Sequence, residues 1–214
     1  MSPEHTQLID GALRSGPVVP VLVIERTDDA VPLARALLAG GVRVLEVTLR
    51  TPNALEVIAI LARQVPDAIV AAGTVTTPEQ WDAAARAGAR LGVSPGLTPR
   101  LLDAARHASM PLLPGVATAS ELMTAMDAGF SRFKFFPAQQ AGGLGMLKAF
   151  GGPFAEAVFC PTGGITPDNA ADYLALPNVA CVGGSWLAPT DALRDGDWAR
   201  ITQLAQAASR LKAR

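Results

Sequence analysis

Residues 131–137 form a short aromatic run with one lysine at its centre, Ser131-Arg132-Phe133-Lys134-Phe135-Phe136-Pro137. Aromatic residues followed by a proline are typical of a buried strand that ends at the proline. A lysine is almost never fully buried without a partner. Burial disfavours its ammonium form and so favours a nucleophilic amine. The alternative is a lysine whose stem packs while its amine reaches water, and residues on the other strands decide between the two.

Eight segments, counting this one, have the composition of buried strands. They are Pro17–Ile24, Arg43–Leu49, Ala68–Ala72, Ala89–Val93, Leu112–Val116, Ser131–Pro137, Ala157–Cys160 and Val179–Val182. Helix-starting signals stand between them, with threonine at the cap and often proline in the first turn. These signals are Thr27-Asp28-Asp29, Thr51-Pro52-Asn53, Thr77-Pro78, Thr98-Pro99, Thr118-Ala119-Ser120-Glu121 and Thr166-Pro167-Asp168.

The regular alternation of strand and helix predicts parallel βαβ units. A doubly wound sheet would also alternate in this way. Eight nearly equal units without a break at the midpoint favour a (β/α)8 barrel. We therefore expect one barrel domain over residues 1–214, preceded by a short helix containing Ile9–Leu13 and followed by an amphipathic helix, Trp198–Leu211.

The composition fits one globular domain and argues against several kinds of partner. Half of the 214 residues are hydrophobic and 17% are charged, which is enough for a sizeable core. The net charge of −1 and the lack of a basic run give no sign of binding to nucleic acid or to a membrane. The start of the chain lacks the features of a signal peptide. Cys160 and Cys181 lie in apolar segments and are expected to be reduced core thiols of a cytoplasmic protein.

Four polar side chains are expected to meet at the carboxyl ends of the strands, where such barrels have their active sites. Alternation puts Glu46 on the inner face of the second strand and Arg50 at its rim, whereas Leu45 and Val47 face the helices. By the same argument Val70, Ala72 and Thr74 align on the third strand, and Lys134 lies inside on the sixth.

Each of these residues has a structural alternative when it is taken alone. Glu46 and Arg50 would make an ordinary structural ion pair, and Thr74 would make a helix cap. Alternation also puts Arg132 inside, near the floor of the barrel, and the sequence offers no partner for it. The convergence of an acid, an arginine, a threonine and a lysine is what indicates a site.

Paired glycines follow the last two strands, at Gly163-Gly164 and Gly183-Gly184, and Ser185 comes next. In such barrels the loops after the seventh and eighth strands bind phosphate. Glycines let backbone N–H groups close on phosphate oxygens, and a serine can donate its hydroxyl. The alternative is that these glycines merely permit turns.

The residues that are missing narrow the chemistry. His5 and His107 stand apart from other metal ligands, so we expect no metal, and no dinucleotide or phosphate-loop fingerprint indicates a cofactor.

A nucleophilic lysine can condense with a ketone to an iminium that accepts electrons from a breaking C–C bond. With an acid as the base and an arginine for a carboxylate, the set predicts a metal-independent aldolase acting on a phosphorylated 2-keto acid.

Several motifs together resemble the 2-keto-3-deoxy-6-phosphogluconate (KDPG) and 4-hydroxy-2-oxoglutarate (KHG) aldolase family over nearly the whole chain. They are Glu46-Val47-Thr48-Leu49-Arg50-Thr51, Ala72-Gly73-Thr74-Val75, Ser94-Pro95-Gly96, Phe133-Lys134-Phe135-Phe136-Pro137-Ala138, Pro161-Thr162-Gly163-Gly164-Ile165 and Gly183-Gly184-Ser185-Trp186.

The resemblance implies a role for each matching residue. Lys134 would form the Schiff base and Glu46 would be the general acid and base. The remaining roles are the carboxylate site, Arg50 and Thr74; the phosphate site, Gly163, Gly164, Gly184 and Ser185; and the pocket lining, Pro95, Phe136 and Thr162. It further implies a cytoplasmic homotrimer that forms pyruvate and glyceraldehyde 3-phosphate.

Three rival functions share parts of this pattern. The galactonate-configured aldolase performs the same chemistry with the opposite stereocentre. A phosphosugar isomerase or epimerase needs no lysine imine, and a sugar-phosphate-binding barrel needs no catalysis. One position departs from the commoner family pattern, because Gln139 stands where an acid is usual. It lies in the loop after the sixth strand, which is expected to shape the preference for the aldehyde.

Overall fold

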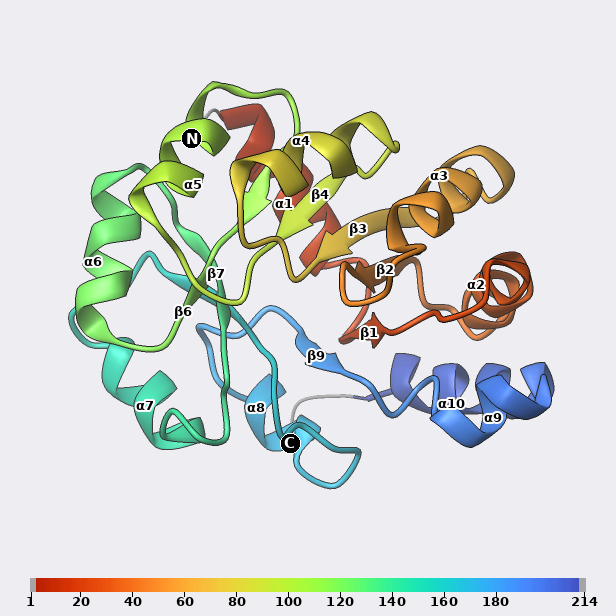
Figure 1. The fold of residues 1–214 in the computed structure, drawn as a ribbon. Coiled ribbons are helices and arrows are strands. Elements are labelled where there is room, and N and C mark those ends of the chain that lie inside the picture. Colours follow the sequence, from red (N-terminus) through yellow and green to blue (C-terminus); the bar gives the residue numbers. More distant parts are fainter. Residues whose placement is uncertain (1–2, 212–214) are drawn as a thin grey trace.

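The computed structural model describes residues 3–211 and consists of alternating strands and helices (Figure 1). The strands are β1 (Val18–Leu22), β2 (Val44–Thr48), β3 (Ile69–Gly73), β4 (Leu91–Val93), β5 (Leu112–Leu113), β6 (Gly115–Val116), β7 (Arg132–Phe135), β8 (Val158–Pro161) and β9 (Val182–Gly184). The helices are α1 (Pro3–Leu13), α2 (Ala30–Ala39), α3 (Ala54–Gln64), α4 (Pro78–Arg86), α5 (Pro99–His107), α6 (Ala119–Asp127), α7 (Gly143–Phe150), α8 (Ala170–Leu174), α9 (Thr190–Asp195) and α10 (Trp198–Ser209), with a 3-10 turn η1 (Thr27–Asp29) before α2.

All paired strands are parallel, which confirms the predicted α/β class. Six of them form one curled sheet in the order β5-β4-β3-β2-β1-β9, and three form a second sheet in the order β6-β7-β8. Two isolated parallel bridges, Phe159 to Val179 and Thr162 to Gly183, lie between the β8 segment and the β9 segment. The parallel order brings the carboxyl ends of neighbouring strands to the same edge.

The predicted strand Leu112–Val116 is divided at Pro114 into β5 and β6. A proline has no N–H to donate to a sheet ladder. β5 pairs with β4, whereas β6 pairs with β7 through Gly115 opposite Lys134. The carbonyl of Pro114 still accepts a hydrogen bond of 2.9 Å from the Lys134 N–H. The chain therefore changes from one sheet to the other at this proline.

Threonine caps were predicted correctly at three helices and wrongly at others. The side chains of Thr77, Thr98 and Thr118 accept N-terminal N–H groups of α4, α5 and α6. By contrast, Thr51 donates to the carbonyl of Ile24 at 3.2 Å, and α3 begins only at Ala54. A hydrogen bond to a distant loop has displaced the local cap.

Other boundaries also differ from those predicted. A 3-10 turn over Thr27–Asp29 precedes α2, and α8 begins at Ala170 after a turn. The last strand is Val182–Gly184 rather than Val179–Val182, because the glycines that were assigned to a loop are still extended. The helix α9 was not predicted at all.

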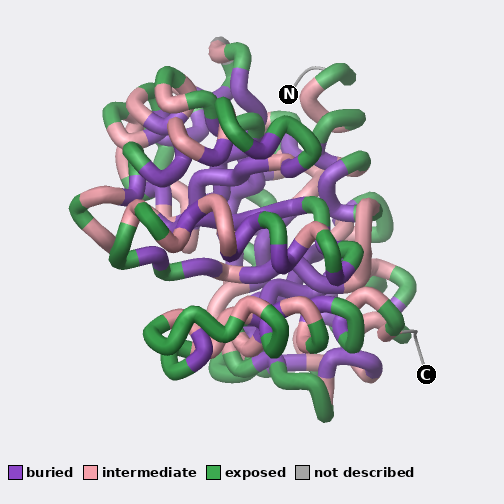
Figure 2. The backbone as a smooth tube through the Cα atoms, turned by 90° about the vertical axis from the view of Figure 1, so that its right-hand side faces the viewer, coloured by how far each residue is buried: buried purple, intermediate pink, exposed green. Residues whose placement is uncertain are grey.

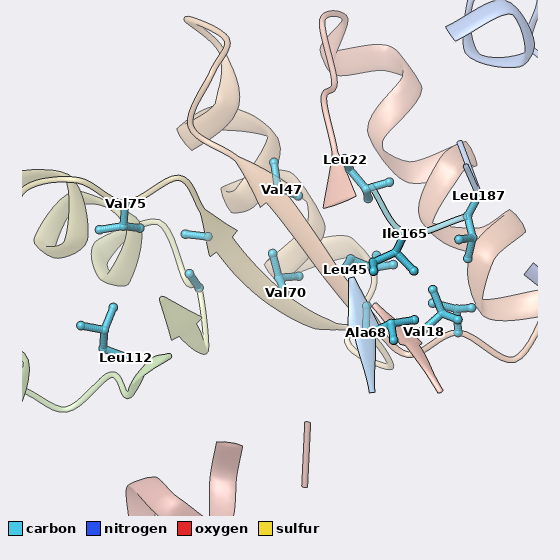
Figure 3. Packing of buried hydrophobic residues seen from close by; sticks show 14 of the residues in the cluster. Val18, Leu22, Leu45, Val47, Ala68, Val70, Val75, Leu112, Ile165 and Leu187 are labelled. Carbon is cyan, nitrogen blue, oxygen red and sulfur yellow. The ribbon is translucent and has the colours of Figure 1, made fainter. Parts of the chain in front are cut away.

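Buried side chains form two clusters on opposite faces of the strands. The larger lies between strands and helices, and Figure 3 shows Leu45, Val47 and Val70 within it. The smaller contains Val44 and Ala71 from the opposite face together with Cys160, Cys181 and three residues of α1. Figure 2 shows buried backbone concentrated in the centre of the molecule and exposed backbone mostly around the outside.

The two clusters test the predicted strand faces. Leu45 and Val47 face the helices, so the assignment of Glu46 to the inner face is confirmed. Val70 and Ala72 share one face of β3 as predicted, but this face packs toward the helices, and it is Ala71 that packs inward. None of the helices between residues 3 and 211 has the length and apolar run that a bilayer crossing requires.

Candidate active site

A buried ion pair lies on the inner face of the strands. Nζ of Lys134 on β7 donates to Oε1 of Glu46 on β2 at 2.9 Å. The side chains are 6% and 4% exposed. The predicted buried lysine therefore has a carboxylate partner rather than an amine that reaches water. Since both charges are out of bulk water, removal of either one would leave the other uncompensated.

The neighbour of Glu46 on the adjacent strand has to be small. A Cβ on Gly73, the last residue of β3, would lie 2.5 Å from Oε1 of Glu46 and 2.7 Å from its Cγ. Only glycine leaves this space free. The sequence analysis quoted Gly73 within a motif but gave it no role. Its position directly before the site residue Thr74 was the feature that could have indicated one.

Thr74 follows with an unusual backbone. It has φ 61°, and among residues 3–211 it is the one non-glycine residue in the left-handed region. For a β-branched residue this conformation is a genuine outlier that costs about 1–3 kcal/mol and is concentrated at functional sites. Because Val70 and Ala72 face the helices, it is this backbone turn after β3, and not strand alternation, that sets the direction of Thr74.

The strands beside Lys134 bring two further predicted residues close. Lys134 lies opposite Gly115 of β6 and Cys160 of β8. A Cβ on Gly115 would collide with the backbone of Pro95, so the Pro95 loop packs directly on β6. The Phe136 ring lies with its centroid 5.4 Å from Nζ of Lys134, within range of a cation–π interaction.

The glycine loop after β8 packs against the end of β7. A Cβ on Gly163 would lie 3.2 Å from Cα of Pro137 and 3.4 Å from the Phe136 ring. Gly163 and Gly164 have φ of 101° and 76°, values that favour glycine. Asn169, which sequence reasoning missed, donates to the Gly164 carbonyl at 3.0 Å and accepts from the Thr166 N–H at 2.9 Å. It holds the two ends of this loop together.

The loop after β9 lies next to it. Thr162 is 5% exposed and is bridged to Gly183, where a Cβ would collide with the threonine side chain. A Cβ on Gly184 would collide with the Trp186 ring. Ser185 is exposed directly after these glycines. The structure therefore brings Thr162, the two glycine pairs and Ser185 into neighbouring loops.

Arg50 is the predicted residue that the structure leaves apart. It is exposed at the rim, two residues beyond β2, and forms none of the ion pairs found within residues 3–211. The structural alternative of a Glu46–Arg50 pair is wrong, because the partner of Glu46 is Lys134. The guanidinium of Arg50 is thus open to an anion arriving from solvent.

Two other groups complete the inner surface. A hydrogen bond with Cys160 and burial raise the pKa of the Cys181 thiol well above its usual value, so this thiol stays protonated. Arg132 has the partner that the sequence did not supply, since its guanidinium binds both carboxylate oxygens of Asp10 on α1.

Over the described part of the chain, no group of three or more His, Cys, Asp or Glu side chains is arranged to hold a metal ion.

A parallel α/β fold with a buried lysine–carboxylate pair, flanked by glycine loops at the carboxyl ends of its strands, defines a class of lysine-dependent enzymes acting on carbonyl substrates. The sequence model of the KDPG and KHG aldolase family matches residues 9–204. The chain belongs to the KDPG and KHG aldolase family.

Individual relatives agree with the family match. The 2-dehydro-3-deoxy-phosphogluconate aldolase of Pseudoalteromonas atlantica is 58% identical over 193 residues, which is 90% of each chain. The solved structure of the KDPG aldolase of Legionella pneumophila, with pyruvate captured as a covalent carbinolamine, has a TM-score of 0.92 at 51% identity and covers 94% of this chain and 97% of that one. The Zymomonas mobilis enzyme with 3-phosphoglycerate has a TM-score of 0.91 at 52% identity and covers 96% of each chain.

Proposed function

We infer that the chain is a class I aldolase that cleaves KDPG to pyruvate and glyceraldehyde 3-phosphate through a Schiff base. The observation that carries this function is the Lys134–Glu46 pair, an amine and a carboxylate 2.9 Å apart and out of bulk water. The family name supports a second activity, cleavage of 4-hydroxy-2-oxoglutarate to pyruvate and glyoxylate. No metal or cofactor enters either reaction.

The pair accounts for the first half of the reaction. Glu46 is within reach to take a proton from the Lys134 ammonium group, which frees the amine to attack the C2 carbonyl. The carbinolamine that forms loses water, with Glu46 returning the proton to the departing hydroxyl, and an iminium remains. The carbinolamine captured in the Legionella protein supports this step.

The same carboxylate serves the second half. Glu46 takes the proton from the C4 hydroxyl, the C3–C4 bond breaks, and its electron pair moves into the iminium to give an enamine. The aldehyde leaves, C3 of the enamine is protonated, and water releases pyruvate and the free lysine. Each proton that Glu46 accepts is given back within one turnover.

The remaining residues are proposed to hold the two ends of the substrate. The open guanidinium of Arg50, with Thr74, would bind the pyruvyl carboxylate. The phosphate would be held by backbone N–H groups of the glycine loops, Gly163-Gly164 and Gly183-Gly184, and by the Ser185 hydroxyl. The 3-phosphoglycerate bound by the Zymomonas protein is in keeping with such a site. Pro95, Phe136 and Thr162 would line the space between the two ends.

We further propose that the two sheets close into one eight-stranded barrel, with β5 and β6 as halves of a single strand and residues 1–214 as one domain. The two bridges between the β8 and β9 segments support closure on one side. The change of partner at Pro114 supports it on the other. A homotrimer in the cytoplasm is proposed on the family resemblance, and sedimentation of the purified chain tests the trimer.

The function is tested by incubation with pyruvate and sodium borohydride, followed by intact mass and peptide mapping. We expect one pyruvyl adduct per chain, located at Lys134. Lys148 on α7 is exposed and serves as the internal control, because nonspecific reaction would label it as well. A protein without an adduct, or with label spread over several lysines, would instead support an isomerase or a binding protein.

Replacement of Ser185 by alanine is expected to weaken binding of the phosphorylated substrate selectively. A hydrogen bond to a charged group contributes about 1.5–3 kcal/mol, so KM for KDPG should rise about 10-fold or more, whereas KM for 4-hydroxy-2-oxoglutarate should change little. Steady-state kinetics on both substrates measures the difference. Thr124→Ala on the exposed face of α6 is the control for loss of a hydroxyl. Equal effects on the two substrates would remove Ser185 from the phosphate site.

A further inference from the structure

The helix α1 lies under the buried ion pair and is fixed there by a second ion pair. Nε of Arg132 donates to Oδ1 of Asp10 at 2.6 Å, and Nη2 donates to Oδ2 at 2.8 Å. Nη1 of Arg132 also donates to the Ser131 hydroxyl at 3.0 Å. The guanidinium is therefore held in a two-point fork with little freedom to rotate.

This clamp differs from the surface ion pairs of the chain. Its side chains are 17% and 26% exposed, whereas those of Arg200 and Asp191 are 47% and 53% exposed. The hydrogen bond from Arg132 lowers the pKa of Asp10, and the same bond raises the pKa of Arg132. Because the carboxyl pKa is lowered in the folded chain, the contribution to stability is complete above its usual pKa and is lost only as acid protonates it. The clamp is closed at neutral pH.

The clamp joins α1 to the strand that carries the nucleophile. Arg132 and Lys134 are two residues apart on β7 and point to the same face. Lys134 meets Glu46 from β2 and lies opposite Cys160 of β8, while Arg132 meets Asp10 from α1. One strand face thus carries two salt bridges, one to the catalytic acid and one to the helix below it.

The apolar side of α1 is the floor of the site. Ile9, Ala12 and Leu13 are buried in the inner cluster. Ala12 and Leu13 also line a cavity of about 10 Å³ together with Lys134 and Glu46, which is at most about the space of one water molecule. If α1 moved away, this space would open and water would reach the ion pair from below. Water in this space would compete for the hydrogen bond between Nζ of Lys134 and Oε1 of Glu46 and would weaken the attraction that holds the two groups in place.

We propose that Asp10 and Arg132 are positioning residues of the aldolase reaction, which hold α1 as a closed floor beneath Lys134 and Glu46. Neither side chain touches substrate. They act by keeping the inner end of the pair dry and by holding β7 so that Lys134 faces Glu46. The proposal rests on Lys134 being the Schiff-base nucleophile.

The test measures the rate constant and the endpoint of pyruvate trapping by borohydride in four proteins. Asp10→Asn keeps the shape of the side chain and removes its charge. Asp10→Arg combined with Arg132→Asp restores an ion pair with the charges exchanged. Asp191→Asn breaks the exposed pair with Arg200 and is the matched control. The wild-type protein gives the reference values.

We expect Asp10→Asn to lower the trapping rate constant about 10-fold, the scale of a small misplacement of reacting groups, with the endpoint still one adduct per chain. The exchanged pair should recover most of the rate, and Asp191→Asn should match the wild type. A merely structural clamp would lower the endpoint, by loss of folded protein, and leave the rate constant unchanged, which would overturn the proposal. A rate loss that the exchanged pair does not recover would also overturn it. Failure of the wild-type protein to trap pyruvate would contradict the proposed function instead.

Discussion

Replacement of Lys134 by alanine is expected to abolish both turnover and pyruvate trapping while the chain remains folded. The amine is the only group of the buried pair that can form a covalent bond to C2, and Glu46 alone cannot stabilise the carbanion that C–C cleavage would otherwise generate. The coupled assay for pyruvate should return to background, and intact mass should show no adduct. Lys148→Ala, which removes an exposed lysine, should leave both readouts unchanged.

Loss of stability has to be separated from loss of chemistry in this variant. Glu46 is 3% exposed, and without Lys134 its carboxylate would be buried and unpaired, at a cost of about 3–5 kcal/mol. We therefore expect a lower Tm for Lys134→Ala and a partial recovery in Lys134→Ala combined with Glu46→Gln, which carries no buried charge. The double variant should be equally inactive. Turnover at the wild-type rate in either variant would rule out the imine mechanism.

The central pair was predictable from the sequence because it depends on local rules. Alternation along β2 and β7 puts Glu46 and Lys134 on inner faces, with Leu45, Val47, Phe133 and Phe135 opposite. The inner faces of the two sheets meet, so that Glu46 and Lys134 are in contact although 88 residues of chain separate them. A period of two and a count of strands were sufficient for this part of the site.

The residues that surround and support the pair were not predictable in the same way. Arg132 was expected inside, but Asp10 lies 122 residues away on a helix whose packing no periodicity determines. Gly73 has a role only because the Glu46 side chain crosses the adjacent strand. Asn169 was missed because the helix cap was assigned to Thr166, whose N–H in fact donates to the Asn169 side chain. Each of these roles arises from tertiary contacts between elements.

The differences in the fold come from single residues that override a local pattern. Pro114 lies within an apolar run that favours one strand, yet its missing N–H divides the run into β5 and β6. The left-handed backbone of Thr74 redirects the chain directly after β3. Both positions are next to the site, where a sequence is expected to depart from the local rules of stable structure.

In the proposed mechanism, the exposed residues of the site bind the substrate and the buried pair carries out the chemistry. Arg50, Gly164 and Ser185 are exposed at the rim, where they can exchange water for the anionic ends of a substrate. Lys134 and Glu46 are buried below them, where charges interact more strongly than in water. Variants at the rim should therefore act mainly on KM, and variants of the pair mainly on kcat.

Replacement of Glu46 by glutamine is the sharpest test of this division. Glutamine has nearly the same shape, and its amide oxygen can still accept a hydrogen bond from the lysine amine, but it cannot carry a proton through the reaction. We expect kcat to fall about 10²–10⁴-fold, the contribution of a general acid and base, while the endpoint of borohydride trapping stays at one adduct per chain. Steady-state kinetics and intact mass on the same preparation measure the two quantities.

The matched control is Glu79→Gln, the same substitution in an exposed ion pair with Arg100 at 3.2 Å. It should leave kcat and trapping unchanged, because the exposed pair is solvated and lies on the outside of α4. A wild-type kcat for Glu46→Gln would remove Glu46 from proton transfer and assign the buried carboxylate to charge balance alone. Loss of the trapping endpoint together with loss of kcat would instead mean that the imine does not form even slowly without the carboxylate. The ratio of the two losses therefore locates the step at which Glu46 acts.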